Sequence, residues 1–229
     1  MIPIRDDQPR FSAPYITYFL IALNLLIYLF ESALDRGSER ALLYTFGVVP
    51  ANITQFMHGA GASSPTFLPL FTSMFLHGSW LHVIGNMWFL WIFGDNVEDY
   101  LGHFKYLIFY LVSGVTAAIA QIVLIPQSQI PTVGASGAIA GVLGAYFILY
   151  PRARVLTWFP PIFLFYLPAW IMLGYWFVLQ FLSGTATSLS YSAQNGGVAF
   201  WAHVGGFVAG IILIKVMPRR AQVARYGTY

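Results

Sequence analysis

The chain has 229 residues, of which 58% are hydrophobic and only 8% charged, with a formal net charge of +3. An average soluble domain is about one-quarter charged, so this composition indicates a polytopic membrane protein built as one helical bundle, without a sizeable soluble domain. The sequence contains no cysteine, which excludes disulfides, thiolate catalysis and cysteine-based metal sites.

The segment before the first apolar stretch is short and charged and contains proline (MIPIRDDQPRFS). No A-x-A-like cleavage site follows that stretch, so we expect it to be retained as the first membrane helix instead of being removed as a signal peptide. Residues 1–13 are therefore predicted to form a cytoplasmic N-terminal segment.

Six apolar stretches can cross a bilayer as helices, because a span needs about 20 apolar residues, or fewer where a helix begins inside the protein. They predict an all-α, polytopic six-helix membrane domain over residues 14–216, followed by a basic cytoplasmic tail, 217–229. The predicted helices cover about 14–33, 74–94, 104–125, 134–150, 160–182 and 198–216.

Lysine and arginine are divided unequally between the two sides of this topology. One side carries only Arg36 and Arg40, and the other carries nine: Arg5, Arg10, Lys105, Arg152, Arg154, Lys215, Arg219, Arg220 and Arg225. Because cytoplasmic connections carry the excess of basic residues, both termini are predicted to be cytoplasmic and residues 34–73 to lie outside. The pI of about 9.2 is thus a topology signal, and nucleic-acid binding is excluded as its cause.

The outer connections differ in length and composition. Residues 34–73 form a long, sparsely charged loop whose stretches FGVVPANI and FMHGAGASSPTFLPLF suit the membrane interface. Residues 183–197 are uncharged and rich in Ser and Gly, which predicts a mobile connection. The sequence has no internal repeat, which argues against the inverted-repeat transporter folds.

The fourth and sixth predicted helices carry glycines at a spacing of four residues, at Gly137 and Gly141 and at Gly206 and Gly210. Small residues at this spacing lie on one helix face and allow two helix backbones to approach closely. The helices that bear Ser136 and His203 are therefore predicted to pack against each other.

Four polar residues are predicted to lie at one depth in the membrane. A rise of about 1.5 Å per residue places Ser136 roughly 21 Å, and His203 roughly 18 Å, from the cytoplasmic ends of their helices. The same count puts His82 roughly 20 Å and Asn86 roughly 14 Å up the second helix, where their i, i+4 spacing gives them one face. We expect them to line a water-accessible cavity that opens toward the outer side.

These residue types suit acyl transfer. A serine hydroxyl is a poor nucleophile until a base accepts its proton, and histidine is the usual base. The spans of Ser136 and His203 contain no Asp or Glu, so the prediction is a Ser–His dyad without a carboxylate. Asn86, His82 and the backbone N–H groups of a helix beginning at Ser136 can stabilise the oxyanion.

Each of these residues also has a structural interpretation. Gly-Ala-Ser-Gly occurs at tight helix contacts, a lone histidine can be interfacial, and an asparagine can hydrogen-bond neighbouring helices. Their coincidence at one depth favours chemistry. We interpret His77 as structural, Asn24 as a packing residue, and Glu98 with Gly102 as a structural turn.

In its motifs the chain resembles the rhomboid family of intramembrane serine proteases. The matching pieces are FLHGSWLHVIGN (75–86), GDNVEDYLG (94–102), GASG (134–137) and AHVGGFVAG (202–210). The resemblance implies a bacterial-type six-helix fold with Ser136 as nucleophile and His203 as general base. It also implies an oxyanion site of Asn86, His82 and the Ser136 backbone N–H, supported by the motif glycines Gly134, Gly137, Gly206 and Gly210.

The resemblance further implies transmembrane protein substrates, no metal or other cofactor, and a location in the bacterial plasma membrane; it does not specify the oligomeric state. It suggests the fifth helix as a gate and Leu182–Gly197 as a flexible lid. Two features depart from the family. Residues 34–70 contain no Trp-Arg pair, and Ala140 occupies a position where some members have a tyrosine that stacks on the catalytic histidine. Another residue must therefore orient His203.

The leading function is thus a membrane-embedded serine endopeptidase. A transporter or channel is the first alternative, because polar groups at one depth can line a permeation path. A non-catalytic, substrate-binding relative is the second, although both Ser136 and His203 are present. The spans contain neither an H-E-x-x-H zinc motif nor a pair of aspartates, which argues against other intramembrane proteases.

Overall fold

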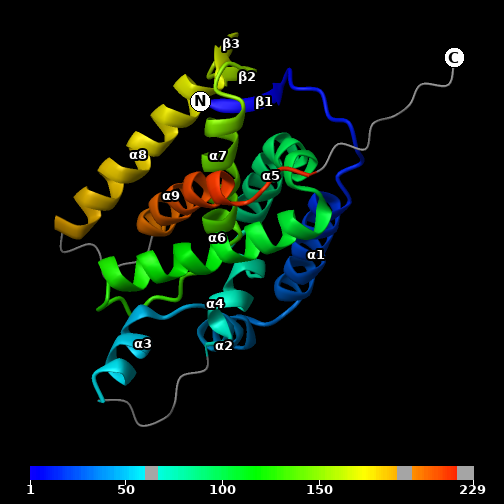
Figure 1. Ribbon diagram of the computed structural model, residues 1–229. Coiled ribbons are helices and arrows are strands. Elements are labelled where there is room, and N and C mark those ends of the chain that lie inside the picture. Colours follow the sequence, from blue (N-terminus) through cyan, green and yellow to red (C-terminus); the bar gives the residue numbers. More distant parts are fainter. Residues whose placement is uncertain (60–66, 190–197, 221–229) are drawn as a thin grey trace, which may run out of the picture.

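The computed structural model describes residues 1–59, 67–189 and 198–220 and shows a mostly helical bundle (Figure 1). A long helix occupies most of each predicted span, which confirms the predicted fold. These helices are α1 (Tyr15–Ser32), α5 (Trp80–Leu101), α6 (His103–Leu124), α7 (Ser136–Leu149), α8 (Ala169–Leu189) and α9 (Phe200–Val216). Helices α1, α6 and α8 are long and apolar enough to cross a membrane, and α7 and α9 are shorter apolar helices.

Helix α7 is the central element. Every residue from Gly137 to Tyr146 is buried, because α5, α6 and α9 surround it. The small side chains of this helix let its neighbours approach closely: a Cβ added at Gly144 would overlap the Phe207 backbone of α9. The predicted packing between the helices that bear Ser136 and His203 is confirmed.

Helix α5 is displaced along the chain from its predicted span, 74–94. Residues Ser73–Phe75 form a 3-10 turn, η1, and α5 begins only after Ser79, whose hydroxyl accepts a hydrogen bond from the His82 N–H at 3.2 Å. A serine at this N-cap position satisfies a backbone donor that the helix leaves free. The helix continues past residue 94 to Gly102, which ends it with a φ of 81°.

A buried carboxylate, Glu98, lies in this last part of α5. Glu98 accepts hydrogen bonds from the N–H groups of Ile16 and Thr17 and from the Thr17 hydroxyl, at 2.9, 2.8 and 2.7 Å. The two backbone donors belong to the first turn of α1, which has no intrahelical partners for them. Glu98, predicted as part of a structural turn, thus caps a neighbouring helix.

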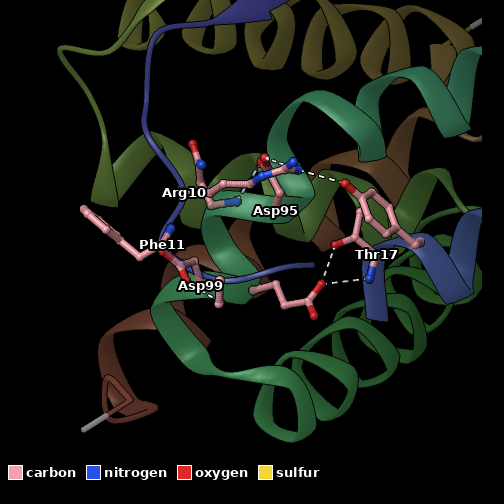
Figure 2. A network of polar contacts seen from close by, with 9 residues as sticks. Arg10, Phe11, Thr17, Asp95 and Asp99 are labelled. Carbon is pink, nitrogen blue, oxygen red and sulfur yellow. Dashed lines mark hydrogen bonds and ion pairs between the residues drawn. The ribbon is translucent and has the colours of Figure 1, made fainter. Parts of the chain in front are cut away.

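The N-terminal segment is held against the same end of α5. Asp99 accepts a hydrogen bond from the Phe11 N–H at 2.9 Å, and the Arg10 guanidinium lies 3.9 Å from the Asp95 carboxylate (Figure 2). These contacts join the residues before α1 to the C-terminal end of α5.

A small antiparallel sheet, absent from the prediction, covers this end of the bundle. Its strands, in the order β1-β2-β3, are β1 (Ile2–Asp6), β2 (Arg154–Phe159) and β3 (Phe163–Pro168). The fifth predicted helix was expected from residue 160, and that boundary is wrong because 163–168 is a strand. Proline at 160, 161 and 168 disfavours an uninterrupted helix, so α8 begins at Ala169.

The connection between α1 and α5 contains further helices: α2 (Arg36–Phe46), α3 (Pro50–Met57) and α4 (Pro69–Thr72). Asp35 caps α2 by accepting from the N–H groups of Gly37 and Ser38 at 2.9 and 3.1 Å. A β-bridge between Val48 and Thr132 attaches this connection to the chain that leads into α7. This bridge anchors the connection, which has no Trp-Arg pair between residues 34 and 70.

Candidate active site

The structure brings the predicted nucleophile and base together. Ser136 is the first residue of α7 and His203 lies in the first turn of α9. The Ser136 Oγ is 2.7 Å from the His203 Nε2, a hydrogen-bond distance. His203 is 8% exposed, so the pair lies in a largely buried site.

The chain before Ser136 has the geometry that places its hydroxyl at a helix N-terminus. Gly134 has a φ of 122°, a conformation that residues with a side chain rarely adopt, and its N–H donates to the Ser73 carbonyl at 2.8 Å. A Cβ at Gly134 would also lie 2.7 Å from the His82 ring. Glycine here therefore permits both the turn into α7 and the approach of His82.

His82 and Asn86, the predicted oxyanion donors, line a cavity of about 790 Å³ together with Ser136 and His203. Asn86 is 8% exposed, and its Nδ2 is 3.0 Å from the Nε2 of His77. One Nδ2 hydrogen is engaged by that ring when its Nε2 is the acceptor, and the other remains for a ligand in the cavity.

His77 is fully buried behind this asparagine. Its backbone N–H donates to the Glu31 carboxylate of α1 at 3.0 Å, and its ring lies 5.1 Å from the ring of His82. These contacts agree with the structural role predicted for His77. Asn24, predicted as a packing residue, is buried in α1 and donates to the Leu20 carbonyl at 2.7 Å.

Sequence reasoning missed two residues of α8 that contact His203. The Gln180 Oε1 lies 2.7 Å from the His203 Nδ1, and the Trp176 ring lies 5.7 Å from the imidazole at an interplanar angle of 34°. A signal was available, because Gln180 is the lone amide in the apolar part of that helix and stands four residues after Trp176. The two side chains therefore share one helix face.

Within residues 1–59, 67–189 and 198–220, the two ring nitrogens of His203 have different hydrogen-bond partners. Nε2 contacts the Ser136 hydroxyl, and Nδ1 contacts the Gln180 amide oxygen. The arrangement suits proton transfer between Ser136 and His203 without a carboxylate. In the same described part of the chain, no group of three His, Asp or Glu side chains is placed to hold a metal ion.

The predicted lid, Leu182–Gly197, is only partly within the described residues, since 190–197 lie outside them. Its first part is not a loop: α8, predicted to end at residue 182, continues to Leu189, and Gly184 lines the cavity. On the other side of the gap, Val198 and Trp201 line the same cavity.

Comparison with known proteins matches residues 64–220 to the Rhomboid domain family. Rhomboid-like protein 11, a chloroplastic protein of Arabidopsis thaliana, is 27% identical over 88% of this chain and 65% of its own length. Rhomboid protease GluP of Bacillus subtilis is 32% identical over 58% of this chain and 24% of its own length. The mitochondrial presenilin-associated rhomboid-like protein of Homo sapiens is 34% identical over 66% of this chain and 38% of its own length. The chain thus spans less than two thirds of the length of each of these relatives.

Proposed function

Because the chain belongs to the rhomboid family, whose domain matches residues 64–220, we propose that it is an intramembrane serine endopeptidase. The observation that carries the proposal is the 2.7 Å separation of the Ser136 Oγ and the His203 Nε2 at the N-terminus of α7, inside a cavity. One relative in the family, GluP, is a rhomboid protease by name.

In the proposed reaction, the Ser136 Oγ attacks the carbonyl carbon of the scissile peptide while its proton passes to the His203 Nε2. His203 then gives that proton to the departing amine nitrogen as the C–N bond breaks, which leaves an ester on Ser136. A water molecule attacks the ester and loses a proton to His203, which returns it to Ser136 as the acid product leaves.

The proposed oxyanion site consists of Asn86, His82 and the backbone N–H of Ser136. Asn86 and His82 line the cavity beside the hydroxyl. Ser136 is the first residue of α7, so its N–H has no partner within the helix and the positive end of the helix dipole lies at the reacting carbonyl. Donors fixed before the reaction stabilise developing charge without reorganisation.

The proposed substrates are transmembrane segments of other proteins, cleaved near the outer membrane face, with both termini of the enzyme in the cytoplasm. The protein is an integral membrane protein, as its family and apolar helices indicate. The comparisons do not support the prediction of a bacterial plasma membrane, because the matched relatives include chloroplastic and mitochondrial proteins.

The test is cleavage of a reporter that carries a single transmembrane segment, with enzyme and reporter in the same proteoliposomes. Wild type should cleave the reporter, and Ser136→Ala and His203→Ala should lose nearly all activity. Ser113→Ala is the matched control, because Ser113 is a buried serine of α6 outside the cavity. Equal cleavage by wild type and Ser136→Ala would overturn the proposal.

A further inference from the structure

A general base must be held in a fixed orientation, and the family motifs in this chain do not identify the residue that orients the His203 imidazole. Ala140, where some family members have a stacking tyrosine, is buried on α7. Its Cβ lies only 3.3 Å from the position a Cβ would take at Gly206 on α9. The two helices are therefore too close at this point for an aromatic ring, and the imidazole needs support from another element.

Helix α8 supplies that support on one face. Trp176 covers the imidazole, and Gln180, one turn later, reaches its Nδ1 at 2.7 Å. In a neutral imidazole one nitrogen carries the proton and the other carries the lone pair. If the Gln180 Oε1 accepts from Nδ1–H, the lone pair is on Nε2 and faces the Ser136 hydroxyl, as a general base requires.

We propose that Gln180 is a positioning residue that holds His203 in the Nδ1–H tautomer, so that the dyad is competent only while α8 is docked. The inference rests on the proposed function. A carboxylate at this position would also stabilise the imidazolium by its charge. A neutral amide fixes the tautomer without that effect.

The position of α8 gives this bond a consequence for activity. Helix α8 lies at the edge of the bundle (Figure 1). Apolar side chains such as Tyr175, Val178 and Leu179 are exposed along it. Ser136 and His203 lie on α7 and α9, which pack tightly together, whereas Gln180 lies on the peripheral helix α8. Displacement of α8 would therefore remove the acceptor from His203 while leaving Ser136 and His203 on their own helices.

The test compares two reactions of the same variants in detergent: cleavage of the transmembrane reporter and the rate of labelling by a small fluorophosphonate. Gln180→Met keeps the shape and helix propensity but removes the acceptor. It should lower kcat and the labelling rate together by about 10- to 100-fold with KM unchanged, less than the roughly 100- to 10,000-fold contribution of a general base. Thr185→Val, also on α8 and bonded only to its own helix at Phe181 among the described residues, is the control and should label as wild type does.

Gln180→Glu restores an acceptor and should restore labelling, and it should move the acid limb of the pH–rate profile to higher pH because a carboxylate favours the imidazolium. This second variant keeps the test valid if Gln180→Met folds poorly. Normal labelling of Gln180→Met would overturn the inference and leave the proposed function intact, even if reporter cleavage fell. An unlabelled wild type would overturn both.

A separate observation concerns the hairpin of β2 and β3. Strand β3 is the edge of the sheet, and its residues 163–166 are exposed on both faces, with Ile162 at the tip 78% exposed. All of these side chains are apolar or aromatic. An exposed apolar edge strand promotes aggregation in water. We therefore expect this surface to face a non-aqueous environment.

The fold indicates that this environment is the bilayer. Strand β3 leads directly into α8, a candidate membrane span, and its exposed surface continues into Trp170 and Ile171 of that helix. Arg152 and Arg154, both exposed, stand at the base of the hairpin where lipid phosphates would lie. Aromatic side chains beside basic ones are typical of the membrane–water interface.

We infer that the β2–β3 hairpin inserts into the interfacial layer of the bilayer. It cannot reach the hydrocarbon centre, because the free backbone groups of β3 need water or lipid head groups as partners. The hairpin would then fix the depth of the start of α8 independently of any catalytic activity.

The absence of cysteine makes the test direct, since single-cysteine variants need no background substitutions. Ile162→Cys, labelled with an NBD fluorophore and reconstituted in phosphatidylcholine vesicles, should show blue-shifted emission that shallow doxyl-labelled lipids quench. Arg36→Cys, at the exposed start of α2, is the control and should report a more aqueous environment. Water-like emission from Ile162→Cys would overturn the inference. A blue shift that disappears on dilution with lipid, without quenching, would also overturn it and would instead indicate a second copy of the chain.

Discussion

Gly210 of α9 lies directly against Gly141 of α7: a Cβ added at Gly210 would overlap the Gly141 carbonyl oxygen and lie 2.7 Å from its Cα. The same relationship holds one turn earlier between Gly206 and Gly137. Because the two helix backbones touch, their N-terminal ends are fixed relative to each other. Those ends carry Ser136 and His203, so the glycine contact sets the distance between hydroxyl and imidazole.

Gly210→Ala should therefore separate α7 from α9. The added methyl group meets backbone atoms, which cannot rotate away, and overpacking of this kind costs about 1–3 kcal/mol or more. We expect a lower thermal unfolding midpoint in detergent and loss of fluorophosphonate labelling. Gly85→Ala on α5 is the control, because a Cβ there meets nothing within 4 Å. If Gly210→Ala were as stable as Gly85→Ala, the close approach of the two helices would be wrong.

Asn86→Ala should lower kcat for reporter cleavage by about 10- to 1000-fold, because one oxyanion donor contributes about that much or somewhat more. KM should change little, since the donor acts on charge that develops in the transition state. Asn24→Ala makes the same chemical change in a buried amide of α1 that does not line the cavity. Its kcat should stay near that of wild type. An unchanged kcat for Asn86→Ala would remove Asn86 from the oxyanion site.

Glu98→Gln should destabilise the bundle without touching the dyad. The amide has one acceptor oxygen where the carboxylate has two, so a buried donor of α1 loses its partner at a cost of about 1–3 kcal/mol. Thr17→Val removes only the hydroxyl contact and should cost less. Chemical denaturation monitored by tryptophan fluorescence measures both. Glu39→Gln on α2 is the control, where an effect within about 0.5 kcal/mol is expected.

Asp6 predicts a pH dependence at the sheet. Burial raises the pKa of its carboxyl group above the usual 3.8, although the hydrogen bond from the Tyr146 hydroxyl opposes the shift. The folded state therefore holds this proton at pH values where the unfolded chain has lost it. By linkage, the contribution of Asp6 to stability falls as pH rises from 3.8 through the raised pKa and is constant above it.

Asp6→Asn removes this titration and keeps an oxygen that accepts from Tyr146. Its unfolding midpoint relative to wild type should rise as the pH increases from about 4 to about 7. Glu39→Gln on α2, which does not contribute to the Asp6 shift, is the control. A difference between Asp6→Asn and wild type that is independent of pH would contradict the assignment.

The sequence was sufficient to predict the helical bundle and the meeting of Ser136 with His203. Length and hydropathy locate membrane helices, and the constant rise of a helix converts residue counts into depth. The glycine spacing then identified which helices touch. These features depend on regular geometry, which the pattern of residues specifies directly.

The sheet and Gln180 depend on tertiary contacts. Residues 163–168 read as the start of a helix because a short apolar run does not distinguish a strand from a helix. The register between β1 and β2 joins residues about 150 positions apart, for which the sequence gives no local signal. The sequence shows Gln180 as a polar residue in a predicted span. Its contact with His203 depends on how α8 is rotated about its own axis relative to α9.

The most direct test of the account is to find where a fluorophosphonate attaches. Purified wild-type protein should gain one adduct, and mass spectrometry of its peptides should place that adduct on Ser136. His203→Ala should lose the adduct while keeping its unfolding midpoint, because it removes the base and leaves the hydroxyl. No adduct on the folded wild-type protein, or an adduct on another serine that persists in Ser136→Ala, would contradict the central claim that Ser136 and His203 form a catalytic dyad.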